Sequence, residues 1–541
     1  MKVHFYGAAG CVTGSCYLLE TPDKKILIDC GMRQGKDSES PLGEDKLLFD
    51  PKEIDYLLLT HAHIDHSGLI PLIVKKGFQG KIITTSATKE LCSIMLPDSG
   101  HIQEAEIEWK NRKERRAGLP DSSPLYTAVD ATKSLQYFTG IEYDQLIPLD
   151  ENIRVRFNDV GHLLGSAAIE VFVETEKGQK KIVFSGDIGN KDKPIIKDPH
   201  YIHEADYVVM ETTYGGRLHT RDANYTKKLC TLIADVFARG GNLVIPAFSV
   251  GRTQEIIYEI SEIIKKNMLP QIERIPVYVD SPLSVEATEI YKKNMAYYDE
   301  QTMNRIQNGD DPFYFDSLHY VKTSEDSKKI NDIKGSKIII SSSGMCDAGR
   351  VKHHLKHNLW RKDSTILFSG YQAVGTLGRK ILEGAKHLKI FGEEISVEAR
   401  IEKLEGFSSH ADQNGLYQWL QAFQSVGKVL LVHGEPEMSA AFGQLIGEKG
   451  YQAEIPQIGD AFDLDTGKLM SAYTPIPVGD LNYSKEIVYA ILQQADQLRM
   501  TVNDCSAMLK RLDKEDRSRG KINSILNEMQ LLSNKLKNFK L

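Results

Sequence analysis

The sequence predicts an α/β protein of more than one domain that ends in a helical tail. Three observations support this prediction: the length, the short apolar runs that recur along the chain, and a change of rhythm near residue 215. With 541 residues, the chain exceeds what a single hydrophobic core usually organises. Its composition, 41% hydrophobic and 26% charged, is that of an ordinary globular protein.

Five apolar runs outside the central region predict buried strands. Each ends at a polar or acidic residue, which places a loop at its carboxyl end. The runs are KILID (25–29), YLLLT (56–60), KIVFS (181–185), YVVME (207–211) and VLLVH (429–433). Because active sites of layered α/β proteins gather at the carboxyl ends of strands, we expect the chemistry there.

Between about 215 and 395, helical patterns alternate regularly with strands. This is typical of βαβ units and a parallel sheet flanked by helices. The strand runs are LVIPAF (243–248), VYVDS (277–281), KIIIS (337–341) and TILFS (365–369). VLLVH follows this region and resembles the runs before it, so we interpret the region as a second domain inserted into the first.

The tail, from about 484 to 541, predicts an amphipathic helical hairpin. Apolar residues recur near helical spacing on both sides of a charged stretch that ends at Gly520. Packing onto its own chain and contact with a partner, as in a homodimer formed through these helices, both remain open.

Composition also indicates the cellular compartment and the kinds of partner that the protein can bind. Seven scattered cysteines with no Cys-x-x-Cys pair favour a reducing cytoplasm over a disulfide framework. No apolar run is long enough to span a membrane, and the first residues lack the apolar core of a secretory signal. The net charge of −7 gives no global sign of nucleic-acid binding, although a local basic groove stays open.

The motif His61-Ala62-His63-Ile64-Asp65-His66 follows YLLLT directly. Imidazole and carboxylate are zinc ligands, and a tight loop after a strand can direct alternate side chains at one spot and the adjacent Asp65 and His66 at another. The alternative is a solvated loop of surface histidines. Such histidines would repel one another when protonated, a problem that a bound metal removes.

One loop cannot complete two metal sites, so further ligands are expected at other strand ends. Taken singly, each candidate is more often an ordinary turn or hydrogen-bonded residue. Together, beside glycines that allow close backbone packing, they form a coherent set. The candidates are Asp29, His162 in GHLLGS (161–166), Asp187 in SGDIG (185–189) and His433 in VHGE (432–435).

The order of these motifs resembles that of the metallo-β-lactamase superfamily. ETTYG (211–215), SSHAD (408–412) and VHGE (432–435) resemble the three motifs of its β-CASP branch, and the likeness extends over roughly residues 1–470. Within that branch the chain is most similar to RNA-processing members, bacterial RNA nucleases and the endonuclease that cuts pre-mRNA 3′ ends. DNA-repair members carry an apolar residue where His433 stands, which favours RNA.

The resemblance implies a fold and a set of metal ligands. The metallo-β-lactamase αββα sandwich would occupy 1–211 and 396–475, the inserted β-CASP domain 212–395, and a helical extension 476–541. It implies two Zn²⁺ per chain and a role for Asp29 in orienting a loop histidine. One zinc would be held by His61, His63 and His162, the other by Asp65, His66 and His433, and Asp187 would bridge both.

The resemblance further implies an RNA hydrolase. A metal-bridged hydroxide would attack the phosphodiester and leave 5′-phosphate and 3′-hydroxyl ends. His410 is the candidate general acid, oriented by Glu211.

The inserted domain would act as a lid, and single-stranded RNA would enter the cleft beneath it. For each arginine proposed to contact the RNA, a surface salt bridge is an equally open interpretation. The candidates are Arg252, Arg350 and Arg379, then Ser343, Gly344, Ser408 and Ser409, and around the mouth Arg217, His219 and Arg221.

Three rival functions stay open on sequence alone. These are a metallohydrolase for a small thioester or lactam, a DNA-directed nuclease of the same branch, and a non-catalytic RNA-binding scaffold. Retention of all seven ligand positions disfavours the scaffold. The inserted domain and the Glu211–His410 pair disfavour a small substrate. Endonuclease and 5′→3′ exonuclease activity are not distinguished.

Overall fold

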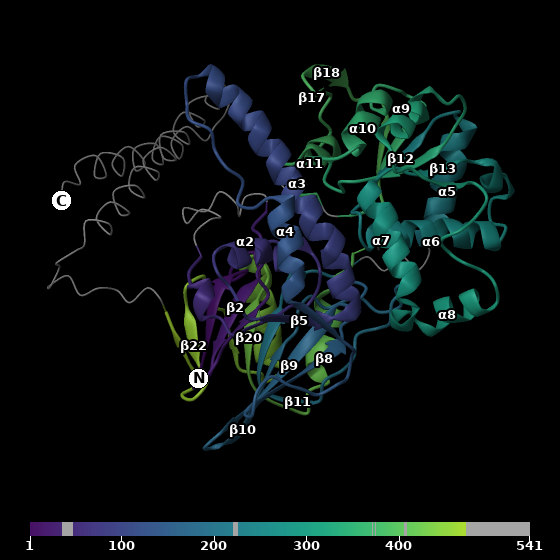
Figure 1. Cartoon of the computed structure of the whole chain (residues 1–541). Coiled ribbons are helices and arrows are strands. Elements are labelled where there is room, and N and C mark those ends of the chain that lie inside the picture. The colour runs from purple at the N-terminus through teal and green to yellow at the C-terminus, as the bar shows by residue number, and fades with distance from the viewer. Residues whose placement is uncertain (35–46, 220–224, 371, 374, 405–407, 472–541) are drawn as a thin grey trace, which may run out of the picture. The chain divides into compact units, whose positions relative to one another are not determined.

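The computed structural model describes residues 1–34, 47–219, 225–370, 372–373, 375–404 and 408–471. Within these ranges the chain forms three large sheets and one two-stranded sheet, with helices packed on them (Figure 1). The predicted tail hairpin and Arg221 lie outside the described residues. In the part of the chain that is described, no helix combines the length and apolarity needed to cross a membrane.

Two sheets face each other across a core built from both, with Phe5, Ile169 and Leu430 among its members. The eight-stranded sheet has the order β23 (Lys468–Met470), β22 (Ala461–Asp463), β1 (Lys2–Gly7), β2 (Cys16–Glu20), β3 (Lys25–Ile28), β4 (Tyr56–Leu58), β5 (Lys81–Thr85) and β6 (Phe138–Ile141). The seven-stranded sheet has the order β21 (Ala453–Glu454), β20 (Ser425–Val432), β11 (Glu204–Glu211), β10 (Gly178–Phe184), β9 (Ala167–Thr175), β8 (Ile153–Asp159) and β7 (Ile147–Pro148).

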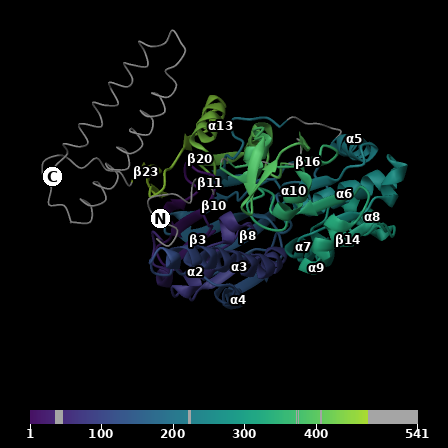
Figure 2. The ribbon, with the colours of Figure 1, turned by 90° about the horizontal axis from the view of Figure 1, so that it is seen from above.

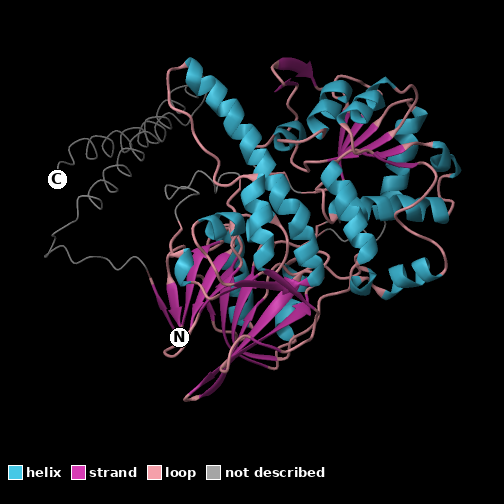
Figure 3. Ribbon diagram, viewed as in Figure 1, coloured by secondary structure: helices cyan, strands magenta, loops and turns pink. Residues whose placement is uncertain are grey.

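Helices cover the outer face of each sheet, which completes the predicted αββα sandwich (Figure 3). The first set is α1 (Ile64–Ser67), α2 (Ile70–Lys75), α3 (Ser86–Arg116) and α4 (Ala128–Ser134). The second set is α12 (Gln413–Gln421) and α13 (Pro436–Glu448). Trp419 and Phe442 of this second set pack against Val208 and Leu431 of the seven-stranded sheet, so each helix buries its apolar side on a strand surface.

The third sheet belongs to an insert between β11 and β20. These two strands pair in parallel within the seven-stranded sheet, although more than 200 residues separate them in sequence. The third sheet is parallel throughout, in the order β14 (Leu318–Tyr320), β13 (Val277–Val279), β15 (Ile338–Ser341), β12 (Leu243–Pro246), β16 (Thr365–Phe368) and β19 (Arg400–Lys403). The fold predicted for the insert is thereby confirmed.

The helices of the insert alternate with its strands, and Figure 2 shows them grouped apart from α2 and α4. They are α5 (Tyr225–Ala238), α6 (Arg252–Lys265), α7 (Pro282–Lys293), α8 (Glu300–Gln307), α9 (Ser324–Asp332), α10 (Val351–Asn358) and α11 (Leu377–Leu382). A small hairpin of β17 (His387–Ile390) and β18 (Glu393–Ser396) follows. β19 then extends the insert's sheet beyond residue 395, where the sequence placed a boundary, and the exact domain limits stay predictions.

Candidate metal centre and active site

All seven predicted ligands lie in one cluster at the carboxyl ends of sandwich strands. His61 and His63 follow β4, and the next turn of chain is α1, which carries Asp65 and His66. His162 lies in the loop between β8 and β9, and Asp187 and His433 follow β10 and β20. The convergence agrees with the rule that parallel strands direct their chemistry to their carboxyl ends.

Close backbone approach makes this convergence possible. A Cβ on Gly31 would lie 1.6 Å from the carbonyl oxygen of Asp65, and one on Gly189 would lie 1.8 Å from that of Gly161. Only glycine fits at either position. Asp29 and His433 adopt left-handed backbone angles, with φ of 58° and 46°, which ends each strand and turns the chain at the site.

The first ligand group consists of His61, His63 and His162. The Nε2 atoms of His61 and His162 lie 3.0 and 3.2 Å from the same atom, Nδ1 of His63. One ring nitrogen carries at most one proton, so it cannot satisfy both neighbours by donation. Ligands bonded to a tetrahedral zinc at its usual distances stand roughly 3.3 Å apart, which fits these separations.

The second group consists of Asp65, His66 and His433. The Nε2 atoms of His66 and His433 are 3.3 Å apart, and Nε2 of His433 lies 3.8 Å from Oδ2 of Asp65. Two imidazoles and one carboxylate are a normal donor set for zinc.

Asp187 stands between the two groups. Its Oδ2 lies 3.5 Å from Nε2 of His61 and 3.6 Å from Nε2 of His162, and its Oδ1 lies 3.3 Å from Nε2 of His66. Oδ1 is buried and makes no hydrogen bond within the described part of the chain. A buried carboxylate oxygen without such a bond needs another partner, so the residues present fit a cation at each side of Asp187.

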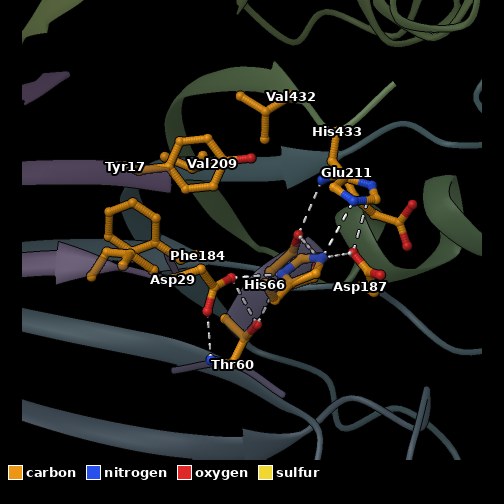
Figure 4. A pocket seen from close by; sticks show the side chains of 13 residues that line it. Tyr17, Asp29, Thr60, His66, Phe184, Asp187, Val209, Glu211, Val432 and His433 are labelled. Carbon is orange, nitrogen blue, oxygen red and sulfur yellow. Dashed lines mark hydrogen bonds and ion pairs between the residues drawn. The ribbon is translucent and has the colours of Figure 1, made fainter. Parts of the chain in front are cut away.

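A set of buried contacts orients the ligands from behind, as Figure 4 shows for His66 and Asp29. Nδ1 of His66 donates to Oδ2 of Asp29 over 2.7 Å, and Thr60 donates its backbone N–H and its hydroxyl to the same carboxylate over 2.8 Å each. The Thr60 hydroxyl also lies 3.1 Å from Nδ1 of His61. These contacts turn Nε2 of both histidines toward the cluster.

Sequence reasoning anticipated Asp29 but missed two threonines. Thr60 is the last residue of the YLLLT run, and Thr213 stands two residues after Glu211. The hydroxyl of Thr213 lies 3.0 Å from Nδ1 of His433. Thr60 stands directly before His61, and Thr213 lies within the ETTYG motif, so both positions could have suggested a role. Threonine is so common at strand ends, however, that neither could be singled out from sequence.

The charges of the cluster follow from its burial. Desolvation, strengthened by neighbouring histidines, holds the pKa of His61 and His162 well below the usual value, so both are neutral. Burial alone would also lower the pKa of His66, but Asp187 and Asp29 raise it well above normal. For Asp187, burial opposes ionisation, yet the surrounding histidines hold its pKa well below the ordinary range.

His410 lies beside this cluster, outside both ligand groups. Its Nδ1 donates to Oε1 of Glu211 over 3.2 Å, and its Nε2 lies 3.8 Å from Oδ2 of Asp187. Burial would lower the pKa of His410, but the carboxylates of Glu211 and Asp187 raise it to about 9.

Asp187, Glu211 and His410 are also close enough together to hold a metal ion. However, Glu211 already accepts the backbone N–H of Ile188 on Oε1 over 2.6 Å and that of Thr213 on Oε2 over 3.2 Å. With its oxygens engaged in this way, Glu211 fits the orientation of a histidine better than metal ligation.

The three arginines predicted to contact RNA all form ion pairs in the insert. Arg252 is buried and pairs with Glu255 over 2.6 Å, Arg350 pairs with the buried Asp280 over 2.7 Å, and Arg379 pairs with Glu383 over 2.7 Å. The salt-bridge interpretation therefore describes this structure. Contact of any of them with phosphate stays a prediction.

The remaining predicted substrate contacts divide between the insert and the surroundings of His410. Gly344 packs against Phe248, and the hydroxyl of Ser343 donates to Ala348 over 3.3 Å. The carbonyl oxygens of Ser408 and Ser409 accept hydrogen bonds from Asn190.

Two residues predicted at the mouth lie beside SSHAD. Nε2 of His219 is 3.0 Å from the carbonyl oxygen of His410, and the carbonyl of Arg217 accepts the N–H of Gln413 over 2.9 Å. The structure thus brings both to the His410 loop.

Comparison with known proteins places these features in a family. Three family profiles match the chain: the metallo-beta-lactamase superfamily over residues 9–230, the Beta-Casp domain over 253–381, and the Zn-dependent metallo-hydrolase RNA specificity domain over 394–456. A ribonuclease of Thermus thermophilus is 34% identical over 463 residues, which span 85% of this chain and 99% of that protein. The chain belongs to the β-CASP branch of the metallo-β-lactamase superfamily.

Other relatives of this β-CASP protein carry two kinds of name. An RNase J-like protein of Methanocaldococcus jannaschii is 31% identical over 82% of this chain and 94% of its own length. A transcription termination factor, FttA of Methanosarcina mazei, is 32% identical over 80% of this chain and 67% of its own length. The family is thus one of metal-dependent hydrolases that includes nucleases, as the motifs predicted.

Proposed function

We propose that this β-CASP protein is a zinc-dependent ribonuclease that hydrolyses single-stranded RNA to 5′-phosphate and 3′-hydroxyl products in RNA processing or decay. The observation that carries the proposal is the position of Asp187. One of its oxygens faces two histidines of the first ligand group and the other faces His66 of the second. A carboxylate that faces both ligand groups would hold two metal ions close together, and two-metal phosphodiester hydrolysis uses such a pair.

The residues that would hold the metals follow from the two groups. His61, His63 and His162 would hold one zinc, Asp65, His66 and His433 the other, and Asp187 would serve both. When bound, the two ions would neutralise charge on the phosphate oxygens and supply an activated water near neutral pH. Asp29 would keep His66 in the tautomer that presents Nε2.

His410 would act as the general acid. Glu211 holds Nδ1, so Nε2 is the atom free to carry a proton toward the substrate. With its pKa raised to about 9, the imidazole keeps that proton at neutral pH. Donation to the departing 3′-oxygen would leave a 3′-hydroxyl, and the phosphate would stay on the 5′ side of the next nucleotide.

RNA is favoured over other substrates by the comparisons. The relative named as a ribonuclease aligns over 99% of its own length, whereas FttA aligns over 67%, so a third of that protein has no counterpart in the alignment. The profile that matches residues 394–456, around His410 and His433, is described as an RNA specificity domain.

The test is turnover of labelled single-stranded RNA, matched DNA and S-lactoylglutathione by the zinc-loaded protein. We expect RNA cleavage with 5′-phosphate products. Thioester cleavage without RNA cleavage would overturn the assignment, and preference for DNA would redirect it. Circular RNA distinguishes endonuclease from 5′→3′ exonuclease activity, because only an endonuclease can open the circle.

The role of His410 is tested with two leaving groups. His410→Ala should keep both zinc ions but lose roughly 10²- to 10⁴-fold in RNA cleavage, the usual contribution of a general acid. Bis(4-nitrophenyl) phosphate has a leaving group that needs no proton, so its hydrolysis should change little. An equal loss on both substrates would refute the general-acid role.

A further inference from the structure

The chain that leaves Asp187 reaches the insert within a few residues. We call residues 188–198 the strap. The strap begins at the metal cluster, runs beside the His410 loop, and then contacts helix α6 and the segment between α7 and α8.

The first part of the strap is hydrogen-bonded to the chain around His410. Gly189 and His410 form an antiparallel bridge, and the N–H of Ala411 donates to the carbonyl of Ile188 over 2.7 Å. Asn190 donates its N–H to the carbonyl of Ser409 over 3.3 Å and its side-chain amide to that of Ser408 over 2.9 Å. These contacts hold the backbone on both sides of His410 against the strap.

The middle of the strap is fastened to the insert by a buried ion pair. Nζ of Lys193 lies 2.5 Å from Oε1 of Glu255 in α6, and both side chains are less than a tenth exposed, at 7% and 8%. Oε2 of Glu255 binds Arg252 over 2.6 Å. Burying two charges costs free energy, so such a pair contributes little net stability. We therefore interpret the Lys193–Glu255 pair as a contact that fixes the position of the strap on α6.

The last part of the strap is held by backbone contacts and carries strain. The carbonyl of Ile195 accepts the N–H of Asp299 over 2.8 Å, and Ile196 bridges Tyr298. Ile195 is buried with φ of 81°, a region that β-branched residues rarely enter. Such a conformation persists only where its surroundings over-determine it, which shows that the insert holds this segment firmly.

We propose that Lys193 and Glu255 are positioning residues for the general acid: their ion pair anchors the strap to the insert so that the backbone of the strap holds His410 against the metal cluster. The insert then does more than cover the substrate, because it fixes a catalytic side chain of the other lobe. The inference rests on the proposed function, since it assigns His410 the role of proton donor.

The central experiment compares two substrates in Lys193→Met, which leaves Glu255 paired with Arg252. A displacement of about 1 Å in a reacting group can cost roughly 100-fold. We therefore expect kcat on RNA to fall at least tenfold, with an unchanged KM and both zinc ions retained. Hydrolysis of bis(4-nitrophenyl) phosphate should fall less than twofold, because its leaving group needs no proton.

Two further variants keep the test decisive. Asn190→Ala removes the side-chain bond at the His410 end of the strap and should show the same pattern, even if Lys193→Met does not fold. Glu90→Ala is the matched control, because Glu90 accepts from Asn294 of the insert over 2.9 Å without touching the strap. Its kcat on both substrates should remain at the wild-type level.

The outcomes separate this inference from the proposed function. If the wild-type protein cleaves the nitrophenyl ester but not RNA, the proposed function fails and the inference falls with it. If the wild type cleaves RNA but Lys193→Met and Asn190→Ala lose both activities equally, or lose neither, only the role of the strap is overturned. A loss in Glu90→Ala equal to that in Lys193→Met would also overturn it.

Discussion

The carboxyl ends of strands in the sandwich and in the insert carry opposite kinds of polar chemistry. In the sandwich, histidines and carboxylates point their atoms at one another at 3.0–3.8 Å, and buried Oδ1 of Asp187 makes no hydrogen bond with the described residues. In the insert, the three candidate arginines each pair with a carboxylate of the insert itself. The Asp187 carboxylate therefore fits a bound cation, whereas the charges of the three arginines are already paired within the insert.

The largest effect is expected where the two ligand groups meet. Asp187→Ala removes the carboxylate that faces both groups, so we expect loss of at least one zinc per chain and a fall in RNA cleavage. Loss of metal-based charge stabilisation, worth several kcal/mol, corresponds to roughly a thousandfold or more. Elemental analysis and single-turnover cleavage measure the two effects.

The matched control for Asp187→Ala is Asp23→Ala, an exposed aspartate in the turn between β2 and β3. It should bind two zinc ions and cleave RNA at the wild-type rate. Full zinc content in Asp187→Ala would contradict this contrast between the sandwich and the insert, because the shared carboxylate would then be dispensable for metal binding.

A smaller effect is expected one contact further from the metal. Thr60→Ala removes the hydroxyl that lies between Asp29 and His61, and loss of such an orienting contact typically weakens metal affinity about 10- to 100-fold. Competition with a chromogenic chelator measures this affinity. Thr84→Ala is the control, because Thr84 is equally buried on the neighbouring strand and donates only to Leu59. Equal affinities in the two variants would contradict the prediction.

The same contrast explains what could be predicted from sequence. Five strands of the sandwich, the parallel sheet of the insert and the convergence of the seven candidate ligands at strand ends could be predicted, because strand runs and motifs are local patterns. The partners of Arg350 and Lys193 could not be predicted in the same way. Asp280 is 70 residues from Arg350, and Lys193 meets Glu255 across two lobes, so only the fold brings these charges together.

Because the pKa of His66 is raised, zinc binding to the cluster should release protons that can be counted. Asp187 and Asp29 keep this buried histidine protonated in the metal-free protein near neutral pH, whereas His61 and His162 are already neutral. Zinc binds only neutral imidazole, so loading the site should release about one proton per chain from His66, besides the proton that a metal-activated water gives up. Calorimetric zinc titrations in buffers of different ionisation enthalpy count the protons. The absence of buffer dependence would contradict the charge assigned to His66.

The smallest effect is expected at the edge of the insert, where Arg379 offers the most accessible of the three guanidinium groups. Its pair with Glu383 spans one helical turn, and both side chains are about a third or more exposed, at 35% and 59%. Exposed pairs contribute about 0–1 kcal/mol, so Arg379→Ala should unfold at nearly the wild-type temperature.

Arg379 could exchange Glu383 for a phosphate when RNA binds. In that case Arg379→Ala removes one phosphate contact whose formation releases a counterion from the RNA. The slope of log Kd against log salt should then decrease by about 0.7 for a single strand. Glu383→Gln is the informative control, because it removes the charge of this ion-pair partner and should strengthen binding at low salt. An unchanged slope in Arg379→Ala would mean that this arginine serves only the fold of the insert.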